Sequence, residues 1–250
     1  MVLARIGVIG SGGIATSIVS YVLLTKSHSL TFIQGRSVGT GIASTTMATA
    51  DELRGTDLVV EAAHPEVITR DGARILRTSD LMVLSCGALV DDGVRVTLEE
   101  TAKKHGTRLI VPHGALVGVE SHLAQTWQSA TIEFVKSPAS LEPAPEHADR
   151  RMVLYDGPVR GIAALYPRNV NAMVTYALAT VGLDHCRARL VSDPDATLGR
   201  LETAATGVDG SRLHIIKEQP MNGVSGTEMA GSVLGSLQKA IEQQPGLVFG

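Results

Sequence analysis

The amino-acid sequence predicts an α/β protein in which a doubly wound parallel sheet is joined to a smaller α+β domain. A glycine-rich turn follows the first apolar run, strand-like and helix-like segments alternate as far as residue 112, and closely spaced strand-like runs dominate beyond Gly114. With 250 residues, 44% of them hydrophobic, the chain can bury a large core. We expect a nucleotide-binding domain over 1–112, a substrate domain over 113–222 and, over 223–250, a C-terminal helix that packs on the first domain.

The first apolar run, Arg5 to Ile9, leads into Gly10-Ser-Gly-Gly-Ile-Ala15 and then into a helical pattern. This order is typical of a Rossmann-type dinucleotide-binding unit, in which Gly10 permits a tight turn and Gly12 lets the backbone approach the pyrophosphate. A helix that starts near Gly13 directs free N–H groups and its positive dipole end at the phosphates. We therefore expect a nicotinamide or flavin cofactor, with Gly10, Gly12, Gly13 and Ile14 among its contacts.

The second strand, expected over 30–33, ends where an acidic residue would bind the ribose hydroxyls of NAD. The chain reads Gln34-Gly-Arg36-Ser37 instead. A guanidinium and a hydroxyl suit a 2′-phosphate, which favours NADP as the preferred cofactor and NAD as a second one. The alternative is that Arg36 is a solvated loop residue.

The remaining elements follow from the hydrophobic pattern. In the first domain we expect strands over 57–62, 81–85 and 108–111 and helices over 67–76 and 94–104. In the second domain we expect strands over 132–136, 190–192, 202–206 and 213–218, a helix over 172–181 and a surface loop over 140–151. The amphipathic stretch 225–243 predicts the C-terminal helix.

Composition excludes several function classes. A net charge of −3 and 3% aromatic residues provide no basic or stacking surface for nucleic acid. No apolar run reaches the roughly 18 residues that span a bilayer, and no targeting segment is evident, so we expect a cytoplasmic protein without a membrane partner. Cys86 and Cys186 are far apart in the sequence, which favours reduced thiols over a disulfide or a metal site.

The chain carries six short strings that matter together: Gly10 to Ala15, Val60 to Ala63, Ser85 to Ala88, Val111 to Gly118, Tyr166 to Asn171 and Ser192 to Pro194. In this order and with similar spacing, they resemble the L-aspartate dehydrogenase family. Two further strings, 153–161 and 61–65, resemble the branch that includes the animal aspartate dehydrogenase domain-containing proteins.

The resemblance implies NAD(P)-dependent oxidation of L-aspartate to iminosuccinate, and the reverse reductive amination. It implies cofactor contacts at Ala62, Ala63, Gly87, Ala115 and Asn169, and a catalytic role for Asn171 in the substrate pocket. Either asparagine could instead cap the helix expected over 172–181. We expect a homodimer that binds an amino or imino acid. Two rival functions remain open: reduction of another imine or keto substrate, and a catalytically silent NADP-binding sensor or scaffold.

The sequence departs from the family where the family carries a catalytic histidine, because the aligned residue is Leu201. Leucine cannot exchange a proton, which removes general acid–base help worth about 10²–10⁴-fold. Asp209-Gly210 predicts a two-residue hairpin loop, in which Leu201 faces Glu218, Glu202 faces Lys217 and His214 faces Ala205. Glu218 then becomes a candidate replacement, or else a solvated strand end.

Other candidates follow the ends of predicted strands or lie in the family strings. His113 follows the strand at 108–111, where ligands bind in such folds, and is a candidate catalytic residue. His64 either binds a substrate carboxylate or caps the helix that starts at Pro65. Lys136 and Arg168 are expected to clamp an anionic substrate or to be solvated at the surface. The other histidines that the sequence places on polar stretches, expected to be solvated, are His105, His122, His147 and His185.

Overall fold

The computed structural model describes residues 3–26, 28–35 and 44–241. It divides the chain into two compact units. Of the described residues, the first unit contains those up to Ser85, Val96–Pro112 and those from Ala230 to Ile241, and the second contains Cys86–Arg95 and His113–Met229. Residues 86–95 and 223–229 thus fall in the second unit, outside the range 113–222 expected from the sequence.

The first unit is built on a parallel sheet in the order β2-β1-β3-β4-β5. All four residues of β3 are buried, as expected for a strand with helices on both faces. The connections run outward in both directions from the β1–β3 pair, which makes the sheet doubly wound and confirms the predicted fold class. The strands are β1 (Arg5–Ile9), β2 (Ser29–Gln34), β3 (Leu58–Glu61), β4 (Asp80–Val83) and β5 (Leu109–Ile110).

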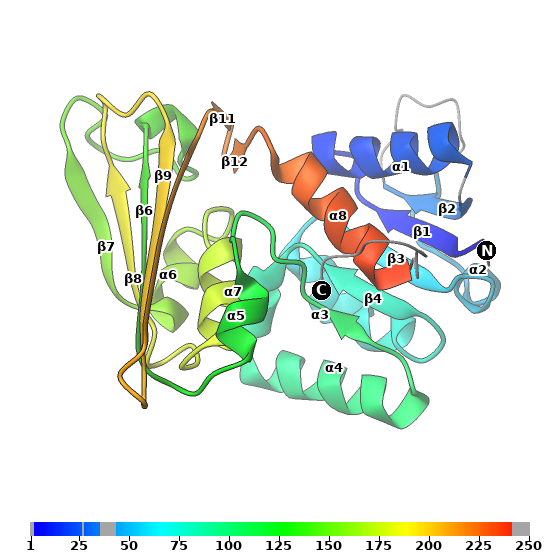
Figure 1. Ribbon diagram of the computed structural model, residues 1–250. Helices are drawn as coiled ribbons and strands as arrows, with labels where there is room; N and C mark the ends of the chain where they lie inside the picture. Colours follow the sequence, from blue (N-terminus) through cyan, green and yellow to red (C-terminus); the bar gives the residue numbers. More distant parts are fainter. Residues whose placement is uncertain (1–2, 27, 36–43, 242–250) are drawn as a thin grey trace. The chain divides into compact units, whose positions relative to one another are not determined.

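Helices cover this sheet, as Figure 1 shows. The C-terminal helix α8 joins the first unit, where Gln238 Nε2 donates to Tyr21 Oη over 2.8 Å and Arg108 donates to the carbonyl of Ala240 over 2.9 Å. It begins at Met229, because residues 225–226 form a strand instead of the first helical turn expected there. The helices of this part are α1 (Gly13–Thr25), α2 (Ala50–Arg54), α3 (Pro65–Ile75), α4 (Asp92–His105) and α8 (Met229–Ile241).

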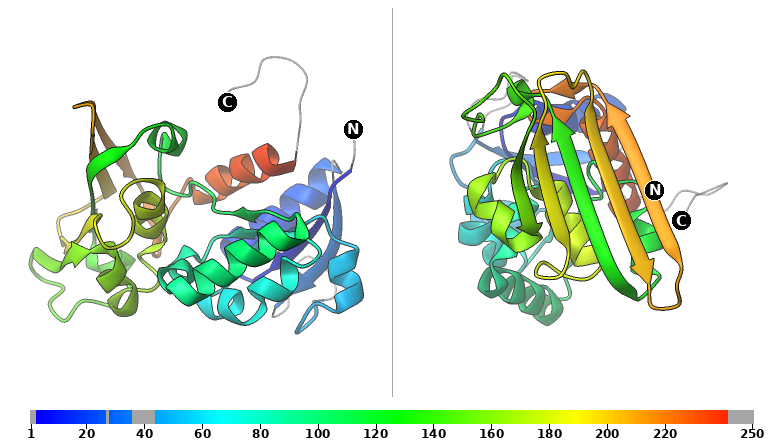
Figure 2. Two further views of the ribbon diagram at one scale, coloured as in Figure 1. Left: turned by 90° about the horizontal axis from the view of Figure 1, so that it is seen from below. Right: turned by 90° about the vertical axis from the view of Figure 1, so that its left-hand side faces the viewer.

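The second unit contains a mixed sheet in the order β10-β9-β6-β8-β7, in which only β6 and β8 are parallel. Its helices lie on one face, and the right-hand view of Figure 2 looks onto the other, open face. The strands are β6 (Trp127–Lys136), β7 (Met152–Pro158), β8 (Arg187–Ser192), β9 (Gly199–Gly207) and β10 (Arg212–Gln219), and the helices are α5 (Val119–Leu123), α6 (Val159–Leu165) and α7 (Asn171–Ala179). Short elements complete the unit: η1 (Cys86–Val90), η2 (Pro138–Ser140), β11 (Met221–Asn222) and β12 (Ser225–Gly226).

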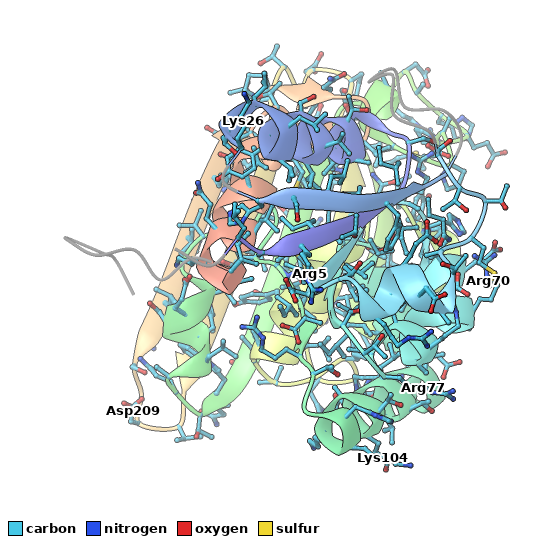
Figure 3. All side chains as sticks on the ribbon, turned by 90° about the vertical axis from the view of Figure 1, so that its right-hand side faces the viewer. Arg5, Lys26, Arg70, Arg77, Lys104 and Asp209 are labelled. Atoms are coloured by element: carbon cyan, nitrogen blue, oxygen red, sulfur yellow. The ribbon has the colours of Figure 1, made fainter. Side chains whose placement is uncertain are left out.

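The predicted register of the β9–β10 hairpin is wrong by one residue. The loop has three residues, because Gly207 N–H donates to Ser211 O over 2.8 Å and Gly210 adopts φ +84°. Asp209, labelled at the hairpin tip in Figure 3, accepts hydrogen bonds from the backbone N–H and hydroxyl of Ser211, which fixes this longer loop.

The shift changes which side chains face one another. Leu201 pairs with Lys217, Glu218 pairs with Arg200, and His214 pairs with Ala204. The predicted facing of Leu201 with Glu218, of Glu202 with Lys217 and of His214 with Ala205 is therefore wrong. The His214 imidazole instead lies 2.6 Å from a carboxylate oxygen of Glu202.

Among the described residues, no helix is both long and apolar enough to cross a membrane.

Candidate functional site

The glycine-rich turn of the first unit is a backbone cradle. Gly10 adopts φ +133°, and a Cβ at this position would overlap the carbonyl oxygen of Ala62. Its N–H donates to Gln34 O over 2.8 Å, while Ala62 N–H donates to Ile9 O over 2.8 Å. Gly10 therefore lets the ends of β1, β2 and β3 come together at one edge of the sheet.

The next two glycines border open space. Among the residues that the structure describes, no atom lies within 4 Å of a Cβ placed on Gly12 or Gly13. Helix α1 starts at Gly13, has no side-chain hydrogen bond at its N-cap and has no acidic residue in its first turn. Bare N–H groups and space in front of them are what a dinucleotide pyrophosphate requires, so these residues fit the cofactor predicted from the sequence.

Glu61 fixes the neighbouring loop. Its buried carboxylate accepts hydrogen bonds from Ala63 N–H at 2.7 Å, from Ser85 N–H at 3.0 Å and from the Ser85 hydroxyl at 2.8 Å. Burial raises the pKa of Glu61, and these donors oppose that effect. The carboxylate thus ties the Ala62–Ala63 loop, a predicted cofactor contact, to the end of β4.

The residues that would select the cofactor follow β2. Gln34 ends this strand, and its Oε1 accepts a hydrogen bond from Ala48 N–H over 2.9 Å. No acidic side chain stands at that position. Arg36 and Ser37, the predicted 2′-phosphate contacts, lie outside the described residues.

His64 caps helix α3. Its Nδ1 accepts a hydrogen bond from Glu66 N–H over 3.4 Å, and Pro65 occupies the first helical position. The capping alternative is thus present in the structure, with the side chain about half exposed. A contact between His64 and substrate stays a prediction.

In the second unit, the structure brings Asn171 and Gly87 together. The Oδ1 atom of Asn171 accepts a hydrogen bond from Gly87 N–H over 3.1 Å. Helix α7 begins at Asn171 and has no side-chain cap, so the capping alternative for this asparagine is wrong. A Cβ at Gly87 would lie 3.3 Å from Val170, and a glycine therefore suits this close approach.

Asn169 and Arg168 serve the loop that follows η2. The buried Asn169 amide accepts from Glu142 N–H over 3.0 Å and donates to Ser140 O over 3.2 Å. Arg168 is exposed and pairs with the Glu142 carboxylate at 3.1 Å. Both residues therefore fasten this loop, and their predicted contacts with cofactor and substrate remain predictions.

Lys136 has a different environment from Arg168. Its side chain is only 1% exposed, its Nζ donates to Val224 O over 2.7 Å, and the Phe134 ring centroid lies 4.1 Å away. Burial lowers the pKa of Lys136 to about 7. The expectation of a solvated lysine is therefore wrong, and a buried cation is available for an anionic ligand.

The loop that starts at His113 is held by a lysine that the sequence did not single out. Lys217 Nζ donates to the carbonyl of Ala115 over 2.8 Å and pairs with the Glu228 carboxylate. The His113 imidazole is half-buried, with Nδ1 3.3 Å from Leu116 O. Lys217 thus fixes the loop that carries two predicted site residues, His113 and Ala115.

Three polar residues were missed or misread from sequence: Glu61 and His122, which are buried, and Lys217, which is mostly buried. Lys217 was misread because the length of the hairpin loop decides which face of the sheet its side chain occupies. Glu61 was missed because its position in the sequence is that of an ordinary polar residue at a strand end. His122, expected to be solvated, is buried, with Nδ1 2.8 Å from Gly118 O and its ring against Trp127 and Tyr176. For Glu61, the only available signal is a carboxylate that directly follows an apolar strand.

Comparisons with known proteins match both units of the chain. A family model described as the homoserine dehydrogenase NAD binding domain matches residues 10–112, and one described as the aspartate dehydrogenase C-terminal domain matches residues 118–240. The crystal structure of aspartate dehydrogenase from Thermotoga maritima has the same fold: the TM-score is 0.78 at 20% identity, and the match covers 99% of each chain. The first unit is accordingly a nicotinamide-dinucleotide-binding domain.

Two curated relatives carry the resemblance in sequence. The L-aspartate dehydrogenase of Methanosarcina acetivorans is 34% identical over 155 residues, which are 57% of this chain and 57% of that protein. The L-aspartate dehydrogenase 1 of Bordetella pertussis is 34% identical over 196 residues, which are 72% of this chain and 74% of that protein. The resemblance stated from the short strings is confirmed: the chain belongs to the aspartate dehydrogenase family.

Proposed function

We propose that this chain is an NAD(P)-dependent amino-acid dehydrogenase that oxidises L-aspartate to iminosuccinate and catalyses the reverse reduction. Water then converts iminosuccinate to oxaloacetate and ammonia. The relatives named L-aspartate dehydrogenase support the substrate. The observation that carries the proposal is the glycine-rich turn at Gly10, Gly12 and Gly13, which leaves open space in front of the N-terminus of α1, where no side chain caps the helix.

Gly10, Gly12, Gly13 and Ile14 would hold the pyrophosphate, and the Ala62–Ala63 loop, fixed by Glu61, would lie against the rest of the cofactor. When bound, a nicotinamide cofactor would supply the hydride chemistry, as acceptor in the oxidation of aspartate and as donor in the reduction of the imine. We propose NADP as the preferred cofactor and NAD as the second. The absence of an acid at Gln34 and the presence of Arg36 and Ser37 in the sequence support this order.

The second unit supplies the substrate end in this proposal. Asn171 and Gly87 form one fixed pair, and Ala115 is fixed by Lys217. His113 would take the proton from the substrate ammonium before hydride leaves, because it is an imidazole on the same loop as Ala115. Lys136 and Arg168 would attract the substrate carboxylates, and the buried Lys136 would contribute more because water screens it less.

Glu218 has no part in this mechanism. Its assignment rested on a register in which it faced Leu201, whereas it lies opposite Arg200 with its side chain about half exposed. Lys217 occupies the place opposite Leu201. We propose that Lys217 is a positioning residue, which acts by holding the Ala115 carbonyl.

A second candidate function follows from Leu201. This side chain is 3% exposed and apolar, at the position that the family resemblance assigns to a proton-exchanging histidine. It favours a diverged homologue that reduces another imine or keto acid, or a silent NADP-binding sensor or scaffold, over full aspartate dehydrogenase activity. These functions differ in which substrate, if any, is turned over after the cofactor binds.

We also propose that the chain acts as a cytoplasmic homodimer. The open face of the second sheet supports a partner copy, because it carries exposed apolar side chains, Ile216 and Val153, beside the ion pairs of Glu133 with Arg189 and Arg200. Sedimentation equilibrium at micromolar concentration tests the dimer, and a monomer at all concentrations would contradict it. Cell fractionation tests the location.

The decisive experiment has two stages. NADPH fluorescence titration measures cofactor binding, and absorbance at 340 nm then measures NADPH oxidation with oxaloacetate and ammonium. Turnover with oxaloacetate and not with other keto acids supports the aspartate proposal. Turnover only with another keto acid identifies a diverged reductase, and tight NADPH binding without turnover on any amino or keto acid identifies a sensor.

A further inference from the structure

Three polar side chains lie in one row across the end of the second sheet. Lys136 ends β6 and pairs in register with Ser192, the last residue of β8. Gln219 ends β10 and pairs with Gly199 on β9. Since Val135 pairs with Arg200, the next step of the ladder sets Gly199 beside Lys136. Side chains of in-register neighbours point to the same face, so Ser192, Lys136 and Gln219 share one face.

All three side chains are buried but incompletely hydrogen-bonded. Ser192, Lys136 and Gln219 are 0%, 1% and 6% exposed. Within the part of the chain that the structure describes, neither Ser192 Oγ nor Gln219 Oε1 has a hydrogen-bond partner, and Lys136 forms no ion pair. Buried polar atoms without partners are unfavourable and uncommon in native proteins, and they therefore need an explanation.

The small hairpin of β11 and β12 covers this row. Its Val224 carbonyl receives the hydrogen bond from Lys136 at 2.7 Å. Gly226 lies directly against the side-chain amide of Gln219, where any Cβ would overlap it. The hairpin has only two residue pairs, Met221 with Gly226 and Asn222 with Ser225. A neutral carbonyl is a weak partner for a buried ammonium, which binds a carboxylate more strongly.

We propose that Lys136, Ser192 and Gln219 form a binding subsite for one carboxylate and the amino group of a short dicarboxylic amino acid, beneath the hairpin 221–226. The Val224 carbonyl occupies the position that a carboxylate oxygen of the substrate takes when the hairpin moves aside. The inference rests on the proposed function and deepens it by naming the groups that select the substrate.

Each member of the row has a donor or acceptor that fits this ligand. Lys136 offers an ammonium and Ser192 a hydroxyl to carboxylate oxygens, while Gln219 Oε1 accepts an N–H of the substrate amine. Lys136 and Gln219 are two strands apart, about 9–10 Å at the usual strand spacing. With both side chains extended toward the ligand, that separation suits a molecule of the size of aspartate, with a carboxylate toward Lys136 and the amine toward Gln219.

Succinate tests the subsite because it is a four-carbon dicarboxylate that cannot be oxidised at an amine. Calorimetry on the protein at pH 6.5 should detect succinate binding, and succinamide, the diamide that carries no carboxylate, should bind at least ten times more weakly. Lys136→Met keeps the length of the side chain and removes its charge, so it should weaken succinate binding at least tenfold. Ser192→Ala should weaken it about threefold.

Lys104→Met is the matched control, because Lys104 is exposed on α4 and points away from the protein (Figure 3). This variant should bind succinate as the unaltered protein does. If Lys136→Met also binds succinate normally, or if the unaltered protein does not bind succinate, the subsite is refuted.

A pH series on the unaltered protein gives a test that needs no variant. Burial sets the pKa of Lys136 to about 7, so the ammonium is lost as pH rises. Succinate affinity should therefore fall about tenfold between pH 7 and pH 8.5, and an affinity that is constant over this range overturns the proposal.

The subsite and the proposed function can fail separately. Succinate binding that depends on Lys136, without aspartate turnover, keeps the subsite and rejects the dehydrogenase. Aspartate turnover with an unchanged KM in Lys136→Met keeps the dehydrogenase and rejects the subsite.

Discussion

Lys217 lies directly opposite Leu201 in the β9–β10 ladder, and its Nζ donates to the Ala115 carbonyl over 2.8 Å. The strand neighbour Glu218 lies on the other face, opposite Arg200. A three-residue loop in place of a two-residue loop produces this exchange, which gives a cation, instead of a carboxylate, the position beside the leucine.

Lys217→Met should lower kcat/KM for oxaloacetate reduction about 10- to 100-fold, because the Ala115 loop loses the bond that holds it and small displacements are costly in catalysis. Steady-state kinetics check this expectation, with kcat and KM reported separately. Lys217→Arg keeps a donor and should recover part of kcat at an unchanged Tm. If Met and Arg variants lose kcat equally, Lys217 does not act through this hydrogen bond.

Glu218→Gln is the matched control on the same strand. Its side chain is exposed on the open face, so kcat/KM should stay within about twofold of the unaltered protein. A large loss of kcat in this variant would restore Glu218 as a catalytic candidate.

Leu201→His should raise turnover of aspartate or of oxaloacetate with ammonium, while the unaltered protein turns over slowly. An imidazole at this position returns general acid–base help of about 10²–10⁴-fold, provided that the buried site accepts the ring. Rates at several pH values check this, because a gain from the new imidazole should show a pH dependence near its titration. An unaltered protein with ordinary dehydrogenase rates would show that the missing histidine is not needed.

The fold was predictable because its strongest signals are local. The turn from Gly10 to Ala15, the buried strands and the helical periodicity of Ile18, Val19 and Val22 each specify structure within a few residues. The strand β7 and helix α6 were missed because no side chain of β7 is fully buried, which weakens its hydrophobic pattern, and a glycine interrupts it. Their places depend on pairing with β8, which is a tertiary contact.

The candidate site was predictable where local backbone geometry determines which residue type is needed. It was not predictable where the environment of a side chain depends on residues that are distant in the sequence. At a phosphate-binding turn, only glycine leaves room for the phosphates and for the close approach of the neighbouring strands. The sequence alone therefore identifies these positions. The surroundings of Lys136 and Asn171 depend on long-range contacts, with Val224 and Gly87 respectively. The register of β10 depends on one additional loop residue, which Asp209-Gly210 does not reveal because that pair suits loops of two and of three residues.

Gly12→Ala and Gly10→Ala should separate cofactor binding from stability. Gly12 has φ −82° and open space at its Cβ, so alanine fits the apoprotein but extends into the phosphate site. NADPH affinity should fall at least about tenfold, a loss of about 1.4 kcal/mol, at an unchanged Tm. Gly10→Ala should lower Tm by several degrees, because the methyl group overlaps Ala62 and φ is +133°. Normal NADPH binding by Gly12→Ala would exclude this cradle as the phosphate site.

Glu61→Gln should change how stability depends on pH. Burial raises the pKa of Glu61 in the folded protein above its ordinary value of 4.5, so its contribution to the free energy of unfolding is fully present below pH 4.5 and is lost as pH rises through the raised pKa. Glutamine cannot ionise. The difference in unfolding free energy, unaltered protein minus variant, should therefore decrease from pH 4.5 to pH 7, by about 1.4 kcal/mol for each unit by which the pKa is raised. Urea unfolding followed by circular dichroism measures it, and a difference that grows with pH would contradict the assignment.

The cofactor preference can be tested at the end of β2. Because the strand ends in Gln34 and is followed by Arg36 and Ser37, NADP should bind more tightly than NAD. Arg36→Asp replaces attraction to the 2′-phosphate with repulsion and offers a carboxylate to the ribose hydroxyls, so it should reverse the preference. Fluorescence titration with NADPH and NADH measures both affinities at one ionic strength, since screening by salt weakens the contribution of Arg36. Arg36→Gln, which removes the charge without adding a repulsive one, should reduce NADPH affinity and leave NADH affinity unchanged. Equal affinities for the two cofactors in the unaltered protein would show that Arg36 is a solvated loop residue.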